Sequence, residues 1–410
     1  MVINVIRLIA ENHKKNLDIR NIGDNLIEDI NNYLIDDDYV LIENAKGASI
    51  DAVMIESGGS EELFLKELDN IKTPFILFST GANNSLAACF EIKTYCFNNK
   101  IHCFFALGDD SQIARYITKA VKAIDSYLKI SDSNLGVIGG KSPWLIASDI
   151  DYKKVKDKFN INLIDIDFKE LENEIDKYLL EPFLPNYDEV LKKYKNKEEV
   201  DKAYYFYSAI KRIVRKYNLN GLTIKCFDLI DKYKGTACLA LSLLNDEGIV
   251  SACEGDVASL LTMYLISRCT DRPCFMANIS SIDNNFESII LSHCTVPLSL
   301  TDNYSIMTHF ESGLGIAIRG NMPLQEISVV KIAPSLSNRD FLFFVSKIKE
   351  NLKLPNFCRT QIRIDFDKDS IGQIMKGNFA NHVIVTYSDI SEDLVFLLDL
   401  FNYFEFEPIE

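Results

Sequence analysis

Three side chains with metal-coordinating atoms stand in the stretch between residues 248 and 297. Glu254, Asn278 and His293 each lie at the end of an apolar run. A carboxylate, an amide oxygen and an imidazole are ligands that divalent cations accept in proteins. Helix capping by Glu254 and turn formation by Asn278 are the alternative interpretation, because polar residues are common at strand ends. The stretch therefore predicts either a divalent-metal site or ordinary strand-end chemistry.

The elements expected here place Glu254 and Asn278 at one edge of one sheet. Residues 249–253 read as a buried strand, residues 257–268 as a helix, and residues 274–277 as a second strand. Strand, helix and strand within 24 residues predict a crossover that makes the two strands parallel. Open α/β sheets bind ligands at the carboxyl ends of their strands. We therefore expect the two side chains to meet at that edge.

The first part of the chain alternates strand and helix patterns. Strands are expected at residues 2–9, 52–57, 74–79 and 101–107, and helices at 22–34, 61–68, 85–91 and 112–128. Repeated units of this kind predict a doubly wound parallel sheet. The polar turns at 57–61 and 80–84 follow two of these strands. They are candidates for lining a ligand cleft, with ordinary loop chemistry as the alternative.

The middle part begins with a strand at 135–138 and a turn that resembles a phosphate-binding loop. That interpretation fails, because Leu135 stands where the motif needs its first glycine and Pro143 interrupts the expected helix. Trp144, the single tryptophan, is predicted to be a packing residue. Further on, residues 190–217 have a charged helical pattern, residues 222–227 form a strand pattern, and residues 238–244 are expected to form a buried helix.

Alternating runs replace this pattern after residue 297. They lie at residues 315–318, 327–332, 341–345 and 361–364, joined by Gly, Pro, Asn and Asp, and predict antiparallel strands in a sandwich or barrel. The chain is thus predicted to be an α/β protein. Two doubly wound parallel-sheet (Rossmann-like) domains, at 1–130 and 131–296, precede a mainly antiparallel β domain at 297–410.

Composition narrows the range of partners. The 410 residues carry 44 basic and 59 acidic side chains, a net charge of −15, which disfavours binding to nucleic acid or an anionic membrane surface. The sequence shows neither a signal-peptide pattern nor an apolar run of 18 residues, so a cytoplasmic protein is expected. The ten cysteines form no C-x-x-C pair and are expected to be reduced core residues.

Several blocks resemble the L-fucose isomerase-like family, which is related to L-arabinose isomerase. They are A-C-E-G-D-V-A-S-L-L-T-M at 252–263, S-P-W-L-I-A-S-D at 142–149, T-H-F-E-S-G at 308–313, C-R-T-Q at 358–361 and G-N-F-A-N-H-V-I-V at 377–385. The resemblance spans most of the chain and is strongest from Leu222 to the end. It implies a homo-oligomeric isomerase that binds manganese or another divalent cation and converts aldoses to ketoses through an enediol.

The resemblance also implies roles for individual residues. Glu254, the residue at position 278 and His382 would hold the metal, and the first two would also act in catalysis. Asn278 stands where the family has aspartate. An asparagine at this position resembles an archaeal-type branch of the family. An amide cannot act as a base near neutral pH. One proton-moving carboxylate is therefore missing. The candidates for substrate binding are His293, His309, Glu311 and Arg359. The first three could also replace the missing carboxylate.

Two functions follow from these expectations. The first is a metal-dependent sugar isomerase, favoured by the presence of Glu254 and His382. The second is a non-catalytic or regulatory sugar-binding protein on the same scaffold, favoured by Asn278. For Glu311 and Arg359, a structural ion pair is the alternative to a site role. In either case the predicted partners are a small-molecule sugar and further copies of the chain.

Overall fold

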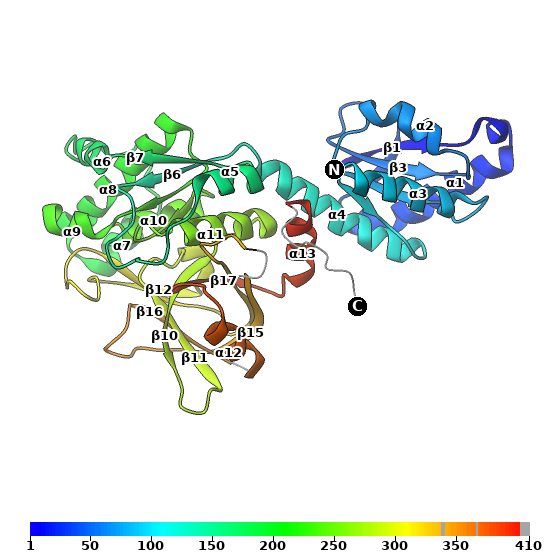
Figure 1. Cartoon of the computed structure of the whole chain (residues 1–410). Helices are drawn as coiled ribbons and strands as arrows, with labels where there is room; N and C mark the ends of the chain where they lie inside the picture. Colours follow the sequence, from blue (N-terminus) through cyan, green and yellow to red (C-terminus); the bar gives the residue numbers. More distant parts are fainter. Residues whose placement is uncertain (338–340, 366–367, 402–410) are drawn as a thin grey trace. The chain divides into compact units, whose positions relative to one another are not determined.

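The computed structural model describes residues 1–337, 341–365 and 368–401 of the chain (Figure 1). Its contacts divide into two compact units. The first unit holds Met1–Leu128 and takes in the C-terminal helix from Glu392, and the second unit holds Lys129–Ser391. The turns at 57–61 and 80–84 lie in the first unit, whereas every residue named individually for the site lies in the second, so the fold of the second unit decides how the site is built.

A five-stranded parallel sheet in the order β2-β1-β3-β4-β5 forms the centre of the first unit. Strands β3 and β4 are buried at every position, as expected for strands of a parallel sheet with both faces covered. The strands are β1 (Val2–Leu8), β2 (Val40–Glu43), β3 (Ile50–Ile55), β4 (Phe75–Ser79) and β5 (Cys103–Phe105). The helices are α1 (Leu17–Leu34), α2 (Glu61–Glu67), α3 (Ser85–Asn98), α4 (Asp110–Ile130) and the returning α13 (Ser391–Leu400).

The second unit contains a four-stranded parallel sheet in the order β7-β6-β8-β9. Its strands are β6 (Asn134–Ile138), β7 (Asn162–Ile166), β8 (Gly221–Ile224) and β9 (Val250–Ala252). The helices that connect and follow them are α5 (Tyr152–Phe159), α6 (Phe168–Ile175), α7 (Tyr187–Tyr194), α8 (Lys197–Tyr217), α9 (Phe227–Tyr233), α10 (Cys238–Asp246) and α11 (Val257–Thr270).

An antiparallel barrel closes in the order β10-β11-β16-β15-β14-β17. Its strands are β10 (Phe275–Ile282), β11 (Ser288–His293), β14 (Glu326–Ile332), β15 (Phe341–Asn351), β16 (Thr360–Asp365) and β17 (His382–Tyr387), accompanied by α12 (Lys368–Lys376). A separate hairpin joins β12 (Asn303–Met307) to β13 (Ala317–Asn321). Two parallel α/β sheets and an antiparallel barrel confirm the predicted fold class. Strands β10 and β11 precede residue 297, so the barrel begins before the predicted third segment.

Helix α11 connects the parallel sheet to the barrel. It is apolar around its circumference and is buried from Val257 to Ser267, as expected for a helix covered on all sides. It contacts β8 and β9 of the sheet and also β14 and β17 of the barrel. Residues at the end of β9 and at the start of β17 are therefore brought to the same end of this helix.

The predicted parallel crossover between Glu254 and Asn278 is wrong. Strand β9 ends the parallel sheet as an edge strand, whereas β10 pairs antiparallel with β11 and β17 in the barrel. The spacing of strand, helix and strand fits both arrangements, because it does not show which sheet the second strand joins. The two side chains therefore meet across two sheets, and not along the edge of one.

The bounds of two other predicted elements in the second unit also differ from those in the structure. The strand expected at 222–227 ends at Ile224, and Phe227 already begins α9. The charged helical pattern at 190–217 forms two helices, because Lys195 adopts a φ of 57° and the side chain of Asn196 caps α8. Among the described residues, no helix is long and apolar enough to cross a membrane.

Candidate metal centre and active site

The loop after β9 holds Glu254 in a conformation that few residues adopt. Its φ of 63° is in the left-handed region, which costs a non-glycine residue on the order of 1–3 kcal/mol. The backbone N–H of Ser142 donates to the Glu254 carbonyl at 2.9 Å. A Cβ on Gly255 would lie 2.1 Å from the carbonyl oxygen of Gly140, so only glycine fits there. The loop after β6 therefore fixes the direction of the Glu254 carboxylate.

Glu254, His293 and His382 converge on one point where the sheet meets the barrel. His293 is the last residue of β11, and His382 is the first residue of β17. One possible ligand atom from each of the three residues lies within 4.8 Å of the other two. Oε1 of Glu254 lies 3.8 Å from Nε2 of His293 and 3.7 Å from Nε2 of His382. Ligand bonds of ~2.0–2.2 Å allow one divalent ion to join atoms 3.7–3.8 Å apart, the separation of Glu254 from each imidazole.

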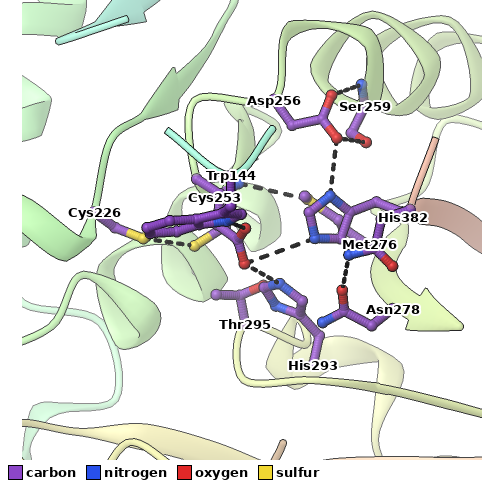
Figure 2. A network of polar contacts seen from close by, with 12 residues as sticks. Trp144, Cys226, Cys253, Asp256, Ser259, Met276, Asn278, His293, Thr295 and His382 are labelled. Atoms are coloured by element: carbon purple, nitrogen blue, oxygen red, sulfur yellow. Dashed lines mark hydrogen bonds and ion pairs between the residues drawn. The ribbon is translucent and has the colours of Figure 1, made fainter. Parts of the chain in front are cut away.

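The outward-facing atoms of the three ligands are hydrogen-bonded to other side chains (Figure 2). Nδ1 of His382 lies 2.8 Å from Oδ2 of Asp256, and Nδ1 of His293 lies 2.9 Å from the Thr295 hydroxyl. The indole N–H of Trp144 donates to Oε2 of Glu254 at 2.7 Å. Such partners orient metal ligands.

The inward-facing nitrogen of His382 supports a metal at this point. Nε2 is buried and has no hydrogen-bond partner among the described residues. Because the carboxylate of Asp256 accepts a hydrogen bond from Nδ1, the neutral imidazole presents a lone pair at Nε2. A divalent cation that displaces the proton from this nitrogen would supply the partner that the described residues do not. The donor set of one carboxylate and two imidazoles fits such an ion.

The charges in the cluster depend on one another. Burial raises the pKa of Glu254, but its contacts with His293 and His382 outweigh burial and leave that pKa well below its usual range. Burial lowers the pKa of His382, yet the carboxylates of Asp256 and Glu254 raise it to about 9. Burial also lowers the pKa of His293. The metal-free cluster therefore holds a proton where a cation would bind.

A buried lysine stands behind the cluster. Asp256 caps α11 by accepting a hydrogen bond from the Ser259 N–H at 2.8 Å, and its other oxygen contacts His382. Nζ of Lys331, from β14, lies 3.7 Å from the same Asp256 oxygen and donates to the Ser259 hydroxyl at 2.6 Å. The side chains of Asp256 and Lys331 are both 0% exposed. Charges buried this deeply are stable only as a pair, so the lysine keeps Asp256 ionised.

Asn278 lies beside the cluster, in register with His382 on the neighbouring strand. Its side-chain oxygen accepts a hydrogen bond from the Asn381 amide at 2.5 Å. That contact uses a lone pair of the oxygen that would have to serve as a metal ligand. The structure therefore brings Asn278 to the position expected for it, with its amide held by a neighbouring side chain.

One cavity joins Glu254 and His293 of the cluster to three other predicted site residues, Asn278, His309 and Glu311. It is lined by Cys226, Phe227, Ile230, Thr236, Cys238, Cys253, Glu254, Asn278, His293, Cys294, His309, Glu311 and Cys358. Five of these side chains are thiols, and Sγ of Cys226 lies 3.0 Å from Sγ of Cys253. None of the ten cysteines, all of which lie among the described residues, forms a disulfide. The cavity therefore presents two residues of the cluster, two further ionisable groups and a wall of mixed polar and apolar side chains to a ligand.

The structural ion pair between Glu311 and Arg359, which we considered as an alternative, is absent from the described residues. Nε of Arg359 donates to the Thr308 carbonyl at 2.7 Å, and its guanidinium lies 5.7 Å above the ring of Phe310. Arg359 is not among the residues that line the cavity, whereas its neighbour Cys358 is. The guanidinium is therefore held against Thr308 and Phe310, and Arg359 is not one of the lining residues.

The interpretation of Trp144 as a packing residue was incomplete. Its ring does pack edge-on against Phe227, with 4.7 Å between centroids, but its N–H also orients Glu254. Its position in the S-P-W block of the resemblance was the signal for a role in the site. Lys331 carried no such signal, since a lysine in an alternating strand is normally exposed.

No family model matches the chain, but curated proteins do. The sulfoquinovose isomerase of Priestia aryabhattai is 20% identical over 386 residues, covering 88% of this chain and 86% of that protein. The sulfoquinovose isomerase of Alkalicoccus urumqiensis is 21% identical over 314 residues, covering 73% and 70%. A sulfoquinovose isomerase from Clostridium sp. (strain MSTE9) is 26% identical over 203 residues, covering 47% and 45%.

These similarities support the resemblance at the level of the L-fucose and L-arabinose isomerase-like superfamily. The relatives are named as isomerases, and two of them align over more than two thirds of both chains. Sugar isomerase chemistry is therefore the activity that the comparisons support for this chain. The cluster of Glu254, His293 and His382 is the candidate metal centre for it.

Proposed function

We propose that the chain is a divalent-metal-dependent aldose–ketose isomerase. The observation that carries this proposal is the convergence of Glu254, His293 and His382, with the buried Nε2 of His382 lacking a hydrogen-bond partner among the described residues. A bound divalent cation would polarise the substrate oxygens and stabilise negative charge that develops on them. Manganese is the proposed ion, and sulfoquinovose, the sugar for which the relatives are named, is the first substrate to test.

The chain's own residues would have separate tasks in this reaction. Trp144 and Asp256 would orient the carboxylate and the imidazole that hold the metal. Asn278 would position a sugar hydroxyl through its amide nitrogen, because its oxygen already accepts a hydrogen bond. The apolar part of the cavity wall, formed by Phe227, Ile230 and five cysteines, would help to exclude water from the reacting carbons.

The proposal predicts metal-dependent ketose formation. Purified protein, stripped with a chelator and reloaded with Mn²⁺, Co²⁺, Mg²⁺ or Zn²⁺, would be offered sulfoquinovose, L-fucose, L-arabinose and neutral hexoses. We expect NMR spectroscopy to show ketose from at least one sugar with the preferred metal, and none after chelation. Sugar binding without ketose formation by the metal-loaded protein would instead favour the binding-protein function.

Asn278→Asp tests whether the cluster takes a cation. The new carboxylate lies beside Glu254, so a bound divalent ion offsets the repulsion between them and we expect metal affinity to rise at least about tenfold. Without metal, two close carboxylates repel one another and the melting temperature should fall. Metal titration and thermal melts of both forms, with and without Mn²⁺, measure the two effects. A variant destabilised equally in both conditions would contradict a metal site at this position.

A further inference from the structure

The proposed isomerisation needs a group that takes a proton from C2 of the sugar and returns it to C1. The inference below rests on that proposed function. Apart from thiols, four ionisable side chains line the cavity: Glu254, His293, His309 and Glu311. Glu254 and His293 belong to the metal cluster, and their inward atoms face its centre. His309 and Glu311 are therefore the two candidates for the proton-moving group.

A buttressed turn presents Glu311 to the cavity. The His309 N–H donates to the Leu314 carbonyl and the Gly313 N–H donates to the His309 carbonyl, both at 3.0 Å. Gly315 adopts a φ of 60°, and a Cβ there would lie 2.7 Å from the backbone nitrogen of Thr236. The Thr236 hydroxyl donates to the carbonyl of Ile316 at 2.6 Å. The turn is thus fixed to the start of α10, and Glu311 stands on a rigid support.

The carboxylate of Glu311 is not held by another side chain among the described residues. Glu311 is an exposed residue that also lines the cavity, and among the described residues it has no hydrogen bond and no ion pair that would hold its carboxylate away from a bound sugar. Burial, assisted by repulsion from Glu254, raises its pKa above the usual value. A carboxylate that is free, held beside a charged cluster and more basic than normal is suited to proton transfer.

His309 is the weaker candidate. Its Nδ1 lies 3.1 Å from the Ser312 hydroxyl, and its ring packs edge-on against Phe227 at 5.5 Å between centroids. Burial, together with repulsion from His293 and Arg359, lowers its pKa to about 4. An imidazole that resists protonation in this way is a poor base but a good neutral hydrogen-bond donor or acceptor for a sugar hydroxyl.

We propose that Glu311 is the catalytic base that moves the carbon-bound proton, in place of the carboxylate that Asn278 lacks. In the first half, the Glu311 carboxylate takes the proton from C2, the C2–H electron pair forms the C1=C2 bond, and the C1=O1 π pair moves to O1, which takes the proton that O2 gives up. In the second half, the electron pair left on O2 forms the C2=O2 bond, and the C1=C2 π pair takes the proton of the Glu311 carboxylic acid at C1. Glu311 ends as it began, and no oxidant or reductant is consumed.

The test is Glu311→Gln in the full-length, metal-loaded protein, with the sugar that the wild-type protein isomerises. General base catalysis is worth about 10²–10⁴-fold, so we expect kcat to fall by at least about 100-fold. KM and the Mn²⁺ dissociation constant should stay within about twofold, because Glu311 lies outside the cluster. Incorporation of solvent deuterium at C2 or C1, followed by NMR spectroscopy in D₂O, should fall in parallel with kcat.

Two further variants complete the test. Glu311→Asp keeps the acid and should recover part of the lost activity, whereas Glu287→Gln, a change at an exposed glutamate outside the cavity, should leave kcat and KM unaltered. A Glu311→Gln protein with kcat within threefold of wild type, or with only KM changed, would overturn the role of Glu311 and leave the proposed function intact. A wild-type protein that forms no ketose from any sugar of the panel would overturn both.

Discussion

Replacing Glu254 with glutamine should abolish stoichiometric metal binding while leaving the fold intact. Glutamine has nearly the same shape, and its side-chain oxygen can still accept the hydrogen bond from Trp144. The substitution removes the one negative charge among the three clustered ligands. Loss of a residue that merely orients a ligand typically costs 10–100-fold in affinity, so loss of the charged ligand should weaken Mn²⁺ binding by more than about 100-fold.

Metal content after gel filtration, together with competition against a fluorescent chelator, would measure this loss. Trp144→Phe is the matched control, because it removes the N–H donor to Glu254 and keeps a ring against Phe227. Its affinity should fall by only about tenfold. A Glu254→Gln protein that still retains one Mn²⁺ per chain at wild-type affinity would show that the cluster is not the metal centre.

The parts of the fold that the sequence predicted best have strong local signals. Strands β3 and β4 are short apolar runs bounded by polar turns, and such runs have few alternatives to a buried strand. The alternating runs after residue 297 indicated antiparallel pairing for the same reason. Long-range pairing was harder to predict. The pattern around α11 fits a crossover within one sheet as well as a passage into a second, and only the packing of both sheets on α11 decides between them.

The candidate site was predictable to the extent that its residues belong to short blocks. Glu254 and His382 come from separate blocks, and the structure brings their side chains to 3.7 Å. The inclusion of His293 in the cluster depends on how β11 and β17 flank β10, which spacing does not reveal. Lys331 is the clearest omission. Its burial follows from the position of α11 over the barrel, a tertiary feature without a sequence signature.

Lys331→Met should be among the most destabilising single changes in the second unit. The side chain has similar volume but no charge, so Asp256 is left with less compensation for its burial. Removing one partner of a buried ion pair costs about 3–5 kcal/mol in the free energy of unfolding. We expect the lower end of that range, because His382, whose pKa is raised to about 9, still contacts Asp256 as a cation in the metal-free protein.

Urea unfolding of the metal-free protein, followed by the fluorescence of its single tryptophan, reports on the second unit because Trp144 lies there. The double variant Asp256→Asn/Lys331→Met removes both charges, and asparagine can still cap α11, so it should be more stable than Lys331→Met alone. Lys347→Met, at an exposed position on β15, should change stability by less than about 0.5 kcal/mol. If Lys331→Met also changes the free energy of unfolding by less than about 0.5 kcal/mol, the charge of Asp256 does not depend on Lys331. The lysine then has no part in holding the imidazole of His382 through Asp256.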